Sequence, residues 1–216
     1  MDSWTIHSFI ESLNAAIESR DSYTAGHSDR VARLSGRIAK EMGYDDKKTE
    51  LIHILGHMHD IGKLAIPDGI LLKNGKYTKE EFEIMKQHPV VGYHIIKRVN
   101  ELEDYAKIIL YHHERIDGKG YPEGIAGSFI PIESCIISVA DVFDAITSNR
   151  SYRSPVDVNK AINIILESKN TQLNEEAVNA FLKVEKGFLE KLSEEALNDK
   201  KSYDYETDRF IKKHIY

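Results

Sequence analysis

The chain has 216 residues, of which 41 % are apolar, enough to form the core of one soluble domain. Its net charge of −6 argues against binding to a DNA or RNA polymer, which requires a basic face. The single cysteine, Cys135, excludes an internal disulfide, and no apolar run approaches the ~18 residues that a membrane span needs. Because the first residues also lack the features of a signal peptide, we expect a cytoplasmic protein.

The spacing of apolar residues predicts helices along nearly the whole chain. In chain order, the expected helices cover residues 4–18, 25–42, 46–61, 78–86, 89–99, 103–113, 131–147, 156–168 and 174–187. Gly43 is typical of a residue that ends a helix, and Thr78 with Glu81 has the spacing of a capping box at a helix start. No strand-like alternation persists, so the predicted fold class is all-α, a compact helical bundle.

Residues 114–130 interrupt this helical pattern with a dense run of glycine and proline. A loop of this length inside a compact domain is usually functional or disordered, so we expect an active-site loop. We place the domain at residues 1–187. Residues 188–216 are rich in charge, and we expect them to form a C-terminal helical extension or a tail.

A histidine and an aspartate stand side by side at His59 and Asp60, and Gly62 and Lys63 follow. An imidazole binds one transition metal, whereas the two oxygens of a carboxylate can bridge two metals. Lys63 would then lie near an anionic substrate. The pair alone is weak evidence, because adjacent His and Asp often lie on a solvated helix face.

Further histidines and a second carboxylate strengthen the prediction of a metal site. Asp141 lies in an apolar run, where a carboxylate is costly unless it is paired or bound to metal; a buried aspartate satisfied by backbone or arginine is the alternative. A helical bundle can bring such residues together in its core. The candidate ligands are His27, His59, Asp60, His88, His112, His113 and Asp141.

Seven segments between residues 20 and 185 form an ordered series, although any one of them alone could arise by chance. They are DSYTAGHSDRV (21–31), HDIGK (59–63), IPD (66–68), MKQHP (85–89), HHERIDGKGYP (112–122), VADVFDA (139–145) and RSYR (150–153). Together they resemble the HD-GYP subgroup of the HD phosphohydrolase superfamily. The resemblance implies an all-helical bundle of the HD-domain type and hydrolysis of cyclic di-GMP, a bacterial second messenger, to pGpG, GMP or both by a metal-activated hydroxide.

The resemblance also implies a set of metal ligands with Asp60 as the bridge. One metal would be held by His27, His59, Asp60 and Asp141, and the second by Asp60, His88, His112 and His113. Asp68 and Glu114 would orient these ligands. Iron or manganese is the usual metal of the family, and the mixed nitrogen and oxygen donors also suit zinc or nickel. Tyr23 stands where some members carry a glutamate for a third metal, so we expect two divalent ions.

The same resemblance assigns Asp60 and Lys63 to catalysis, with Lys63 on the scissile phosphate. Arg150 and Arg153 would hold phosphate or guanine, because the planar guanidinium forms paired hydrogen bonds and stacks on bases. The alternative for both arginines is that of solvated turn residues, and for Lys63 that of a surface residue after a helix end.

Substrate-binding roles also fall on the predicted loop. Gly120, Tyr121 and Pro122 would shape it around the nucleotide, and the alternative is a loop that serves only as a lid. Asp21 would position the water or the nucleotide, or else cap a helix. Ile116 occupies a position that is usually aromatic in the family, which would weaken base stacking.

Two alternatives to an active cyclic di-GMP phosphodiesterase stay open. The chain could be a weakly active or inactive sensor of cyclic di-GMP, or an HD phosphohydrolase for another cyclic dinucleotide. Expected partners are cyclic di-GMP, regulatory or GGDEF-type signalling domains and, in a homodimer, a second copy of the chain.

Overall fold

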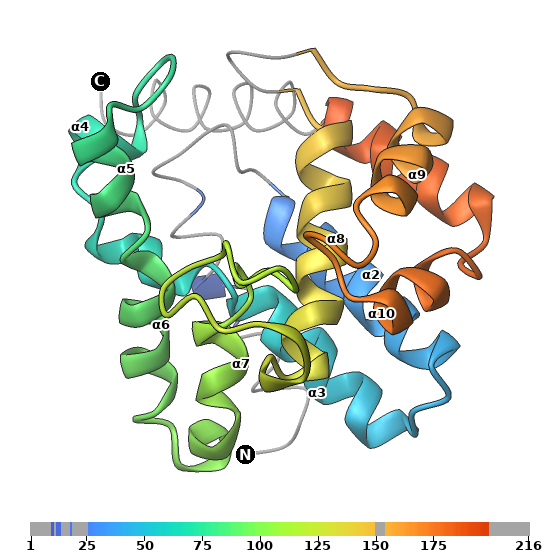
Figure 1. The fold of residues 1–216 in the computed structure, drawn as a ribbon, viewed down its shortest axis with the longest axis horizontal. Coiled ribbons are helices and arrows are strands. Elements are labelled where there is room, and N and C mark those ends of the chain that lie inside the picture. The colour runs from blue at the N-terminus through green and yellow to red at the C-terminus, as the bar shows by residue number, and fades with distance from the viewer. Residues whose placement is uncertain (1–9, 11, 14–17, 19–25, 150–153, 199–216) are drawn as a thin grey trace, which may run out of the picture.

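The computed structural model describes residues 10, 12, 13, 18, 26–149 and 154–198 (Figure 1). These residues form helices and loops, and within them the sole bridge of β type is an isolated pair between Lys169 and Leu173. The prediction of an all-α bundle is therefore confirmed. The helix expected over residues 4–18 lies mostly outside the described residues.

The main α-helices follow the predicted order. They are α2 (His27–Glu41), α3 (Asp46–Met58), α5 (Lys79–Met85), α6 (His88–Ile96), α7 (Ala106–Leu110), α8 (Ile132–Thr147), α9 (Val158–Glu167) and α10 (Glu175–Phe181). They are joined by the 3-10 helices η1 (Ile61–Ala65), η2 (Asn100–Tyr105) and η3 (Gly127–Phe129), and by the one-turn α4 (Asp68–Leu71). Among the helices described, none combines the length and hydropathy that a membrane crossing requires.

The core forms around α2, which packs against α3, α8 and α10 (Figure 1). Val31, Leu34 and Ile38 recur at helical spacing on α2 and are almost completely buried. The start of α2 is fixed by Glu18, whose two carboxylate oxygens accept hydrogen bonds from the backbone N–H groups of Gly26 (2.8 Å) and Ser28 (2.9 Å). This cap holds the first turn of α2 against the centre of the bundle.

Helix α3 ends at Met58, three residues earlier than the pattern predicts. Asp60 leaves the α conformation, at φ −97° and ψ 7°, and the chain tightens into η1. The reason is the packing of η1 on α6, because a Cβ atom at Gly62 would overlap the carbonyl oxygen of His88 and lie 2.6 Å from the backbone nitrogen of Gly92. A regular helix with a side chain at this position could not approach α6 so closely.

Two other predicted helices are also divided. The expected helix over 103–113 begins as η2 and continues as α7. The expected helix over 174–187 ends at Phe181, and a separate helix covers residues 186–198, the last that the structure describes before the C-terminal end. Leu189 and Leu192 of this second helix are buried in the main core. Glu195 pairs with Arg33 on α2, so part of the predicted extension packs on the bundle.

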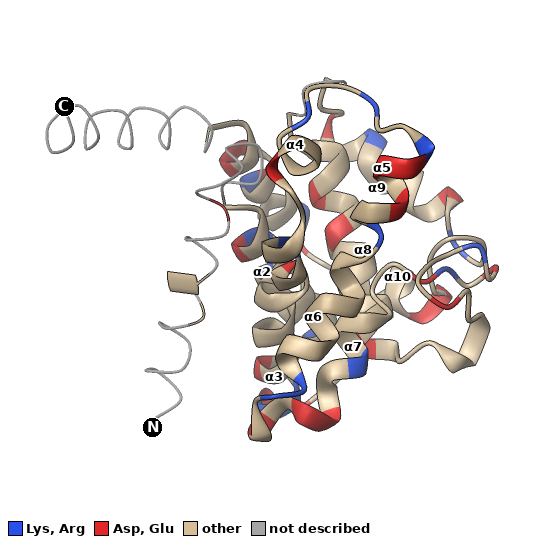
Figure 2. Cartoon of the chain, turned by 90° about the vertical axis from the view of Figure 1, so that its left-hand side faces the viewer, with Lys and Arg blue, Asp and Glu red and all other residues tan. Residues whose placement is uncertain are grey.

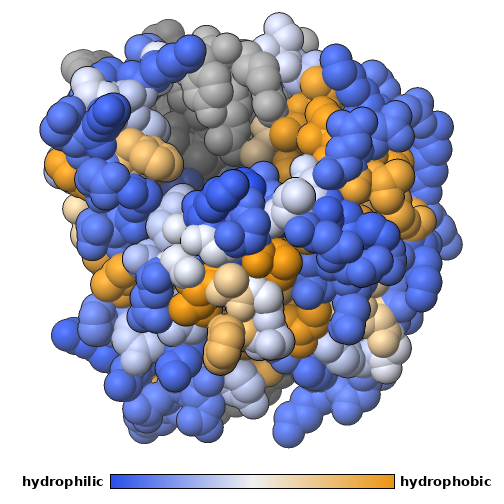
Figure 3. Space-filling model, in the orientation of Figure 1, coloured by the Kyte–Doolittle hydropathy of each residue, from blue (hydrophilic) through white to orange (hydrophobic). Residues whose placement is uncertain are grey.

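The surface carries charges of both signs. Figure 2 shows acidic and basic residues interspersed along the visible helices. The face in Figure 3 is mostly hydrophilic, with apolar side chains in small groups. The side of the molecule in Figure 2 shows no continuous basic area among the described residues.

Candidate metal centre

Helix ends from different parts of the chain bring the predicted ligands together. His27 is the first residue of α2 and His88 the first of α6, whereas His59 directly follows α3. His112 and His113 lie just after α7, and Asp141 lies within α8. Two groups of ligand atoms, each within 4.8 Å of one another, result: His27, His59 and Asp60 in one, and Asp60, His88, His112 and His113 in the other.

Three of the histidines are oriented in the same way. Each Nδ1 lies at hydrogen-bond distance from the carbonyl oxygen three residues earlier, at the end of a helix. The pairs are His59 with Gly56 (2.7 Å), His88 with Met85 (2.8 Å) and His112 with Ile109 (2.6 Å). A proton on Nδ1 satisfies the carbonyl and leaves Nε2 as an electron-pair donor that faces the site.

The buried nitrogen atoms show that a metal fits this site. Nε2 of His88 and Nε2 of His112 are buried and have no hydrogen-bond partner among the described residues. An unsatisfied buried polar atom costs about 1–3 kcal/mol, and two of them side by side call for a common partner. Imidazole nitrogens and a carboxylate are donors that divalent transition metals accept.

Asp60 belongs to both groups of ligand atoms. Its Oδ2 atom lies 3.6 Å from Nε2 of His27 and 3.3 Å from Nε2 of His59, whereas its Oδ1 atom lies 3.3 Å from Nε2 of His88. The two oxygens therefore face different histidines. Lys63 lies on the same side, with Nζ 2.5 Å from Oδ2, because side chains three residues apart nearly eclipse in a 3-10 helix.

The electrostatics of the cluster keep most of its histidines neutral. Burial lowers the pKa of His88 to about 4, and burial together with neighbouring histidines lowers the pKa of His112 and His113 well below the usual value. Burial opposes ionisation of Asp60, but Lys63 and the histidines hold its pKa well below the usual range. Neutral imidazole and ionised carboxylate are the forms that bind metal.

Asp144, which the sequence analysis did not single out as a site residue, orients His27. Its Oδ2 atom lies 2.7 Å from Nδ1 of His27 and accepts a hydrogen bond from Ser148 (3.1 Å), and Nε of Arg30 donates to its Oδ1 atom (2.6 Å). Burial lowers the pKa of His27, but Asp144 and Asp60 outweigh this effect and raise it to about 9. The one available signal was its position three residues after Asp141, one helical turn away.

Asp141 lies between the two groups of ligand atoms. Its Oδ1 atom is 3.5 Å from Nε2 of His27, and its Oδ2 atom is 4.0 Å from Nδ1 of His113. The structure thus places all seven predicted ligands in one cluster, with Asp141 beside rather than within the two compact groups.

The glycine-rich loop packs on the cluster through Gly120 and Tyr121. A Cβ atom at Gly120 would lie 2.5 Å from Cα of Glu114 and 2.6 Å from the carbonyl oxygen of His113, so only glycine allows this approach. The Tyr121 ring then lies 4.8 Å from the His113 ring, between centroids. Pro122 follows Tyr121 in the loop and lines neither of the two cavities described at the site.

Other predicted residues have different surroundings. Glu114 is buried and accepts hydrogen bonds from the backbone N–H groups of Glu123 (2.7 Å) and Gly124 (2.9 Å), so it fixes the loop. Ile116 packs against the main core and lines neither cavity. Asp68 is exposed at the start of α4. Asp21, Tyr23, Arg150 and Arg153 lie outside the described residues.

A cavity of about 580 Å³ opens beside the cluster. Lys63 and Tyr121 line it together with the ligands Asp60, His88 and Asp141. A second cavity of about 330 Å³ adjoins it and shares Tyr121 and Asp141. The cluster is therefore accessible to a ligand and is not sealed within the core.

Residues 11–176 match the family model described as HD domain. The chain belongs to the HD domain family. The match covers most of the chain and confirms the resemblance that the ordered motifs indicated.

Three curated relatives carry related names. A cyclic di-GMP phosphodiesterase of Thermotoga maritima is 48 % identical over 179 residues, which are 82 % of this chain and 49 % of the relative. The cyclic di-GMP phosphodiesterase response regulator RpfG of Xanthomonas campestris is 37 % identical, over 81 % of this chain and 47 % of the relative. The 3'3'-cGAMP-specific phosphodiesterase 3 of Vibrio cholerae is 31 % identical, over 85 % and 40 %. The chain spans less than half the length of each.

Solved structures share the fold of this HD domain. An HDG"Y"P protein of Bdellovibrio bacteriovorus superposes with a TM-score of 0.61 at 21 % identity, over 74 % of this chain and 52 % of that one. A cyclic GMP-AMP-specific phosphodiesterase of V. cholerae gives a TM-score of 0.62 at 16 % identity, over 88 % and 52 %. At these identities the likeness concerns the fold alone.

Proposed function

We propose that this chain is a metal-dependent phosphodiesterase that hydrolyses cyclic di-GMP to pGpG, GMP or both. The observation that carries the proposal is the pair of ligand groups that share Asp60, in which Nε2 of His88 and Nε2 of His112 are buried without a hydrogen-bond partner among the described residues. The cluster lies beside a cavity large enough for a nucleotide. Two relatives named cyclic di-GMP phosphodiesterase support the choice of substrate.

Two divalent ions would occupy the cluster, and iron and manganese fit its donors. His27, His59, Asp60 and Asp141 would hold one ion, and Asp60, His88, His112 and His113 would hold the other. Bound there, the ions would act as Lewis acids on the phosphate and lower the pKa of a water molecule towards neutrality.

The protein side chains would position the substrate. Lys63 lines the cavity next to Asp60 and supplies an ammonium group for the scissile phosphate. Burial and the nearby carboxylates of Asp141 and Asp60 raise the pKa of Tyr121, so its phenol stays protonated and can donate a hydrogen bond to the nucleotide. Gly120 holds the backbone of the loop close enough to the cluster for this contact.

We assign three further substrate contacts to residues outside the described ranges. Arg150 and Arg153 would bind phosphate or guanine, and Asp21 would position the nucleotide or the attacking water. This assignment is supported by the family motifs in which these residues stand. We also propose that the chain works in the cytoplasm and under the control of a regulatory domain; the second part is supported by the name of the X. campestris relative, a response regulator.

A second candidate substrate is 3'3'-cGAMP, because three V. cholerae relatives at 31–40 % identity are named for it. The two dinucleotides differ in one purine, so contacts between the metal centre and a phosphate cannot by themselves select one substrate over the other. A sensor that binds without turnover would have the same cluster but no product.

The test is metal analysis of anaerobically purified protein, paired with product chromatography on cyclic di-GMP and on 3'3'-cGAMP at equal concentrations. We expect linear product from cyclic di-GMP in the iron or manganese form and at least tenfold slower conversion of 3'3'-cGAMP. Faster conversion of 3'3'-cGAMP would transfer the assignment to that substrate. Tight binding of cyclic di-GMP without product would make the chain a sensor.

A further inference from the structure

The cavity beside the metal centre has a second wall, which is formed by residues that are not candidate metal ligands. Asp60, His88 and Asp141 line one part of the cavity, and the segment from Leu71 to Phe82 lines another. At about 580 Å³, the cavity lies within the ~300–1,000 Å³ range of ligand pockets and exceeds the needs of ions and a single phosphate. Much of its volume is therefore available to the parts of a ligand that do not contact the metal centre.

The second wall is held in place by its own contacts. One carboxylate oxygen of Glu81 accepts hydrogen bonds from the backbone N–H of Thr78 (2.7 Å) and from Nζ of Lys73 (2.5 Å). These two bonds attach both ends of the segment from Lys73 to Thr78 to the first turn of α5. A small cluster that includes Leu71 and Met85 packs beneath it. The wall is thus formed before any ligand arrives, which reduces the entropic cost of binding.

Two ammonium groups of this wall face the same cavity. Lys76 and Lys79 line it and are exposed, and their side chains form no ion pair or hydrogen bond within the part of the chain that the structure describes. Lys73 also lines the cavity but is paired with Glu81. In a chain with a net charge of −6, two such cations in one cavity favour an anionic ligand.

The wall also exposes large apolar side chains into the cavity. Leu72 is 44 % exposed and Phe82 43 %, although both are of a kind usually buried. The Phe82 ring stands edge-on to the Tyr121 ring, with centroids 6.1 Å apart and planes at 79°. Phe82 also lines the adjoining cavity. A simple phosphate would make no favourable contact with these apolar side chains, whereas the face of a purine would pack on them.

We propose that Lys76, Lys79 and Phe82 form a half-site for the part of a cyclic dinucleotide that lies away from the metal centre. This inference rests on the proposed function. A cyclic dinucleotide carries two phosphates and two purines, and the cluster can take one phosphate. Lys76 and Lys79 then pair with the other phosphate, and Phe82 packs on a purine.

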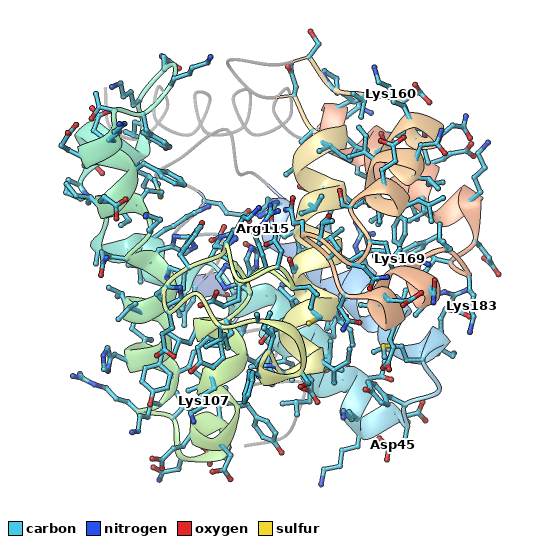
Figure 4. All side chains as sticks on the ribbon, in the orientation of Figure 1. Asp45, Lys107, Arg115, Lys160, Lys169 and Lys183 are labelled. Carbon is cyan, nitrogen blue, oxygen red and sulfur yellow. The ribbon has the colours of Figure 1, made fainter. Side chains whose placement is uncertain are left out.

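The experiment that tests the half-site compares two double variants, each of which loses two positive charges. Lys76→Gln with Lys79→Gln removes the proposed cations. Lys160→Gln with Lys183→Gln removes two exposed lysines that line neither cavity and lie across the molecule from α5 (Figure 4). Binding of a hydrolysis-resistant phosphorothioate analogue of cyclic di-GMP to the metal-loaded chain is measured by fluorescence polarisation. We expect about 10- to 100-fold weaker binding for the first variant, from two charge-assisted contacts, and less than about twofold for the control.

Three more measurements separate a binding role from a structural one. Lys76→Arg with Lys79→Arg should keep the affinity within about threefold, because arginine also pairs with phosphate. Added salt should weaken binding less in the glutamine variant than in the unmodified chain, because fewer exposed charges are screened. Phe82→Leu should weaken binding by about 5- to 30-fold through lost stacking, with unchanged metal content.

The outcomes distinguish this inference from the proposed function. If the unmodified chain does not bind the analogue, the proposed function fails, and the half-site fails with it. If the chain binds and both double variants bind equally well, only the half-site is wrong. Turnover of bis(p-nitrophenyl) phosphate, which has one phosphate and no purine, gives a further criterion. A parallel loss for this substrate and for cyclic di-GMP would place the lysines at the metal centre and overturn the half-site.

Discussion

Asp144 shows how a single side chain can orient a predicted metal ligand without being one of the ligands itself. It is buried, contacts His27 directly and pairs with Arg30. A carboxylate that holds the remote nitrogen of a ligand histidine fixes the orientation of the ring and increases its basicity. Such a residue affects the metal affinity through the histidine, so we class Asp144 as a positioning residue.

Replacing this carboxylate should weaken the adjacent metal position. We expect Asp144→Asn to lower the affinity for one of the two ions by about 10- to 100-fold. It should also lower the free energy of unfolding by about 3 kcal/mol, because Arg30 loses its buried partner. Chelator competition measured well below the melting temperature gives the affinity. Asp29→Asn, on the exposed side of α2, is the control, and equal affinities in both variants would refute the positioning role.

Gly120 is the second residue on which the site depends. Gly120→Ala would press a methyl group against the backbone of Glu114 and His113, and overpacking of this kind costs about 1–3 kcal/mol. We expect that loss in chemical denaturation, together with weaker binding of cyclic di-GMP because Tyr121 moves with the loop. Gly69→Ala should be neutral, since nothing lies within 4 Å of its Cβ position. Equal stability of the two variants would mean that the loop adapts.

At the scale of the helices, the sequence predicted which elements exist better than where they end. The capping box of Thr78 and Glu81 opens α5 as expected, because both hydrogen bonds are local to the segment. The early end of α3 was not predictable, because it depends on contact between Gly62 and α6, which lies about 26 residues further along the chain. Contacts between distant segments leave no periodic signal in either one.

The helix over residues 186–198 offers a direct test of how the domain ends. Leu192 is 2 % exposed and Leu197 is 43 % exposed on the same helix. Leu192→Ala should lower the free energy of unfolding by about 2–4 kcal/mol through a core cavity, and Leu197→Ala by less than about 0.5 kcal/mol. Urea denaturation measures both. If Leu192→Ala is as mild as Leu197→Ala, this helix is dispensable, and the domain ends near residue 187 as the sequence analysis proposed.

At the scale of the whole molecule, the seven candidate ligands were recognisable because their motifs occur in the order of a known family. Their convergence follows from the fold, which brings the ends of α3 and α7, the starts of α2 and α6 and the interior of α8 to one place (Figure 1). The wall formed by Lys76, Lys79 and Phe82 was not recognisable. Exposed lysines and a half-exposed aromatic residue carry no pattern in sequence, and their common orientation towards one cavity appears only in three dimensions.

The central claim is a binuclear centre bridged by Asp60, and metal stoichiometry tests it most directly. Elemental analysis of the anaerobically loaded chain, with anomalous diffraction to locate the ions, should give two metals per chain. Asp60→Ala should lose both ions and all turnover, because one carboxylate serves both positions. His59→Ala should lose mainly the ion next to His27. One fully occupied site in the unmodified chain, a third ion near Tyr23, or near-normal metal content in Asp60→Ala would contradict the account.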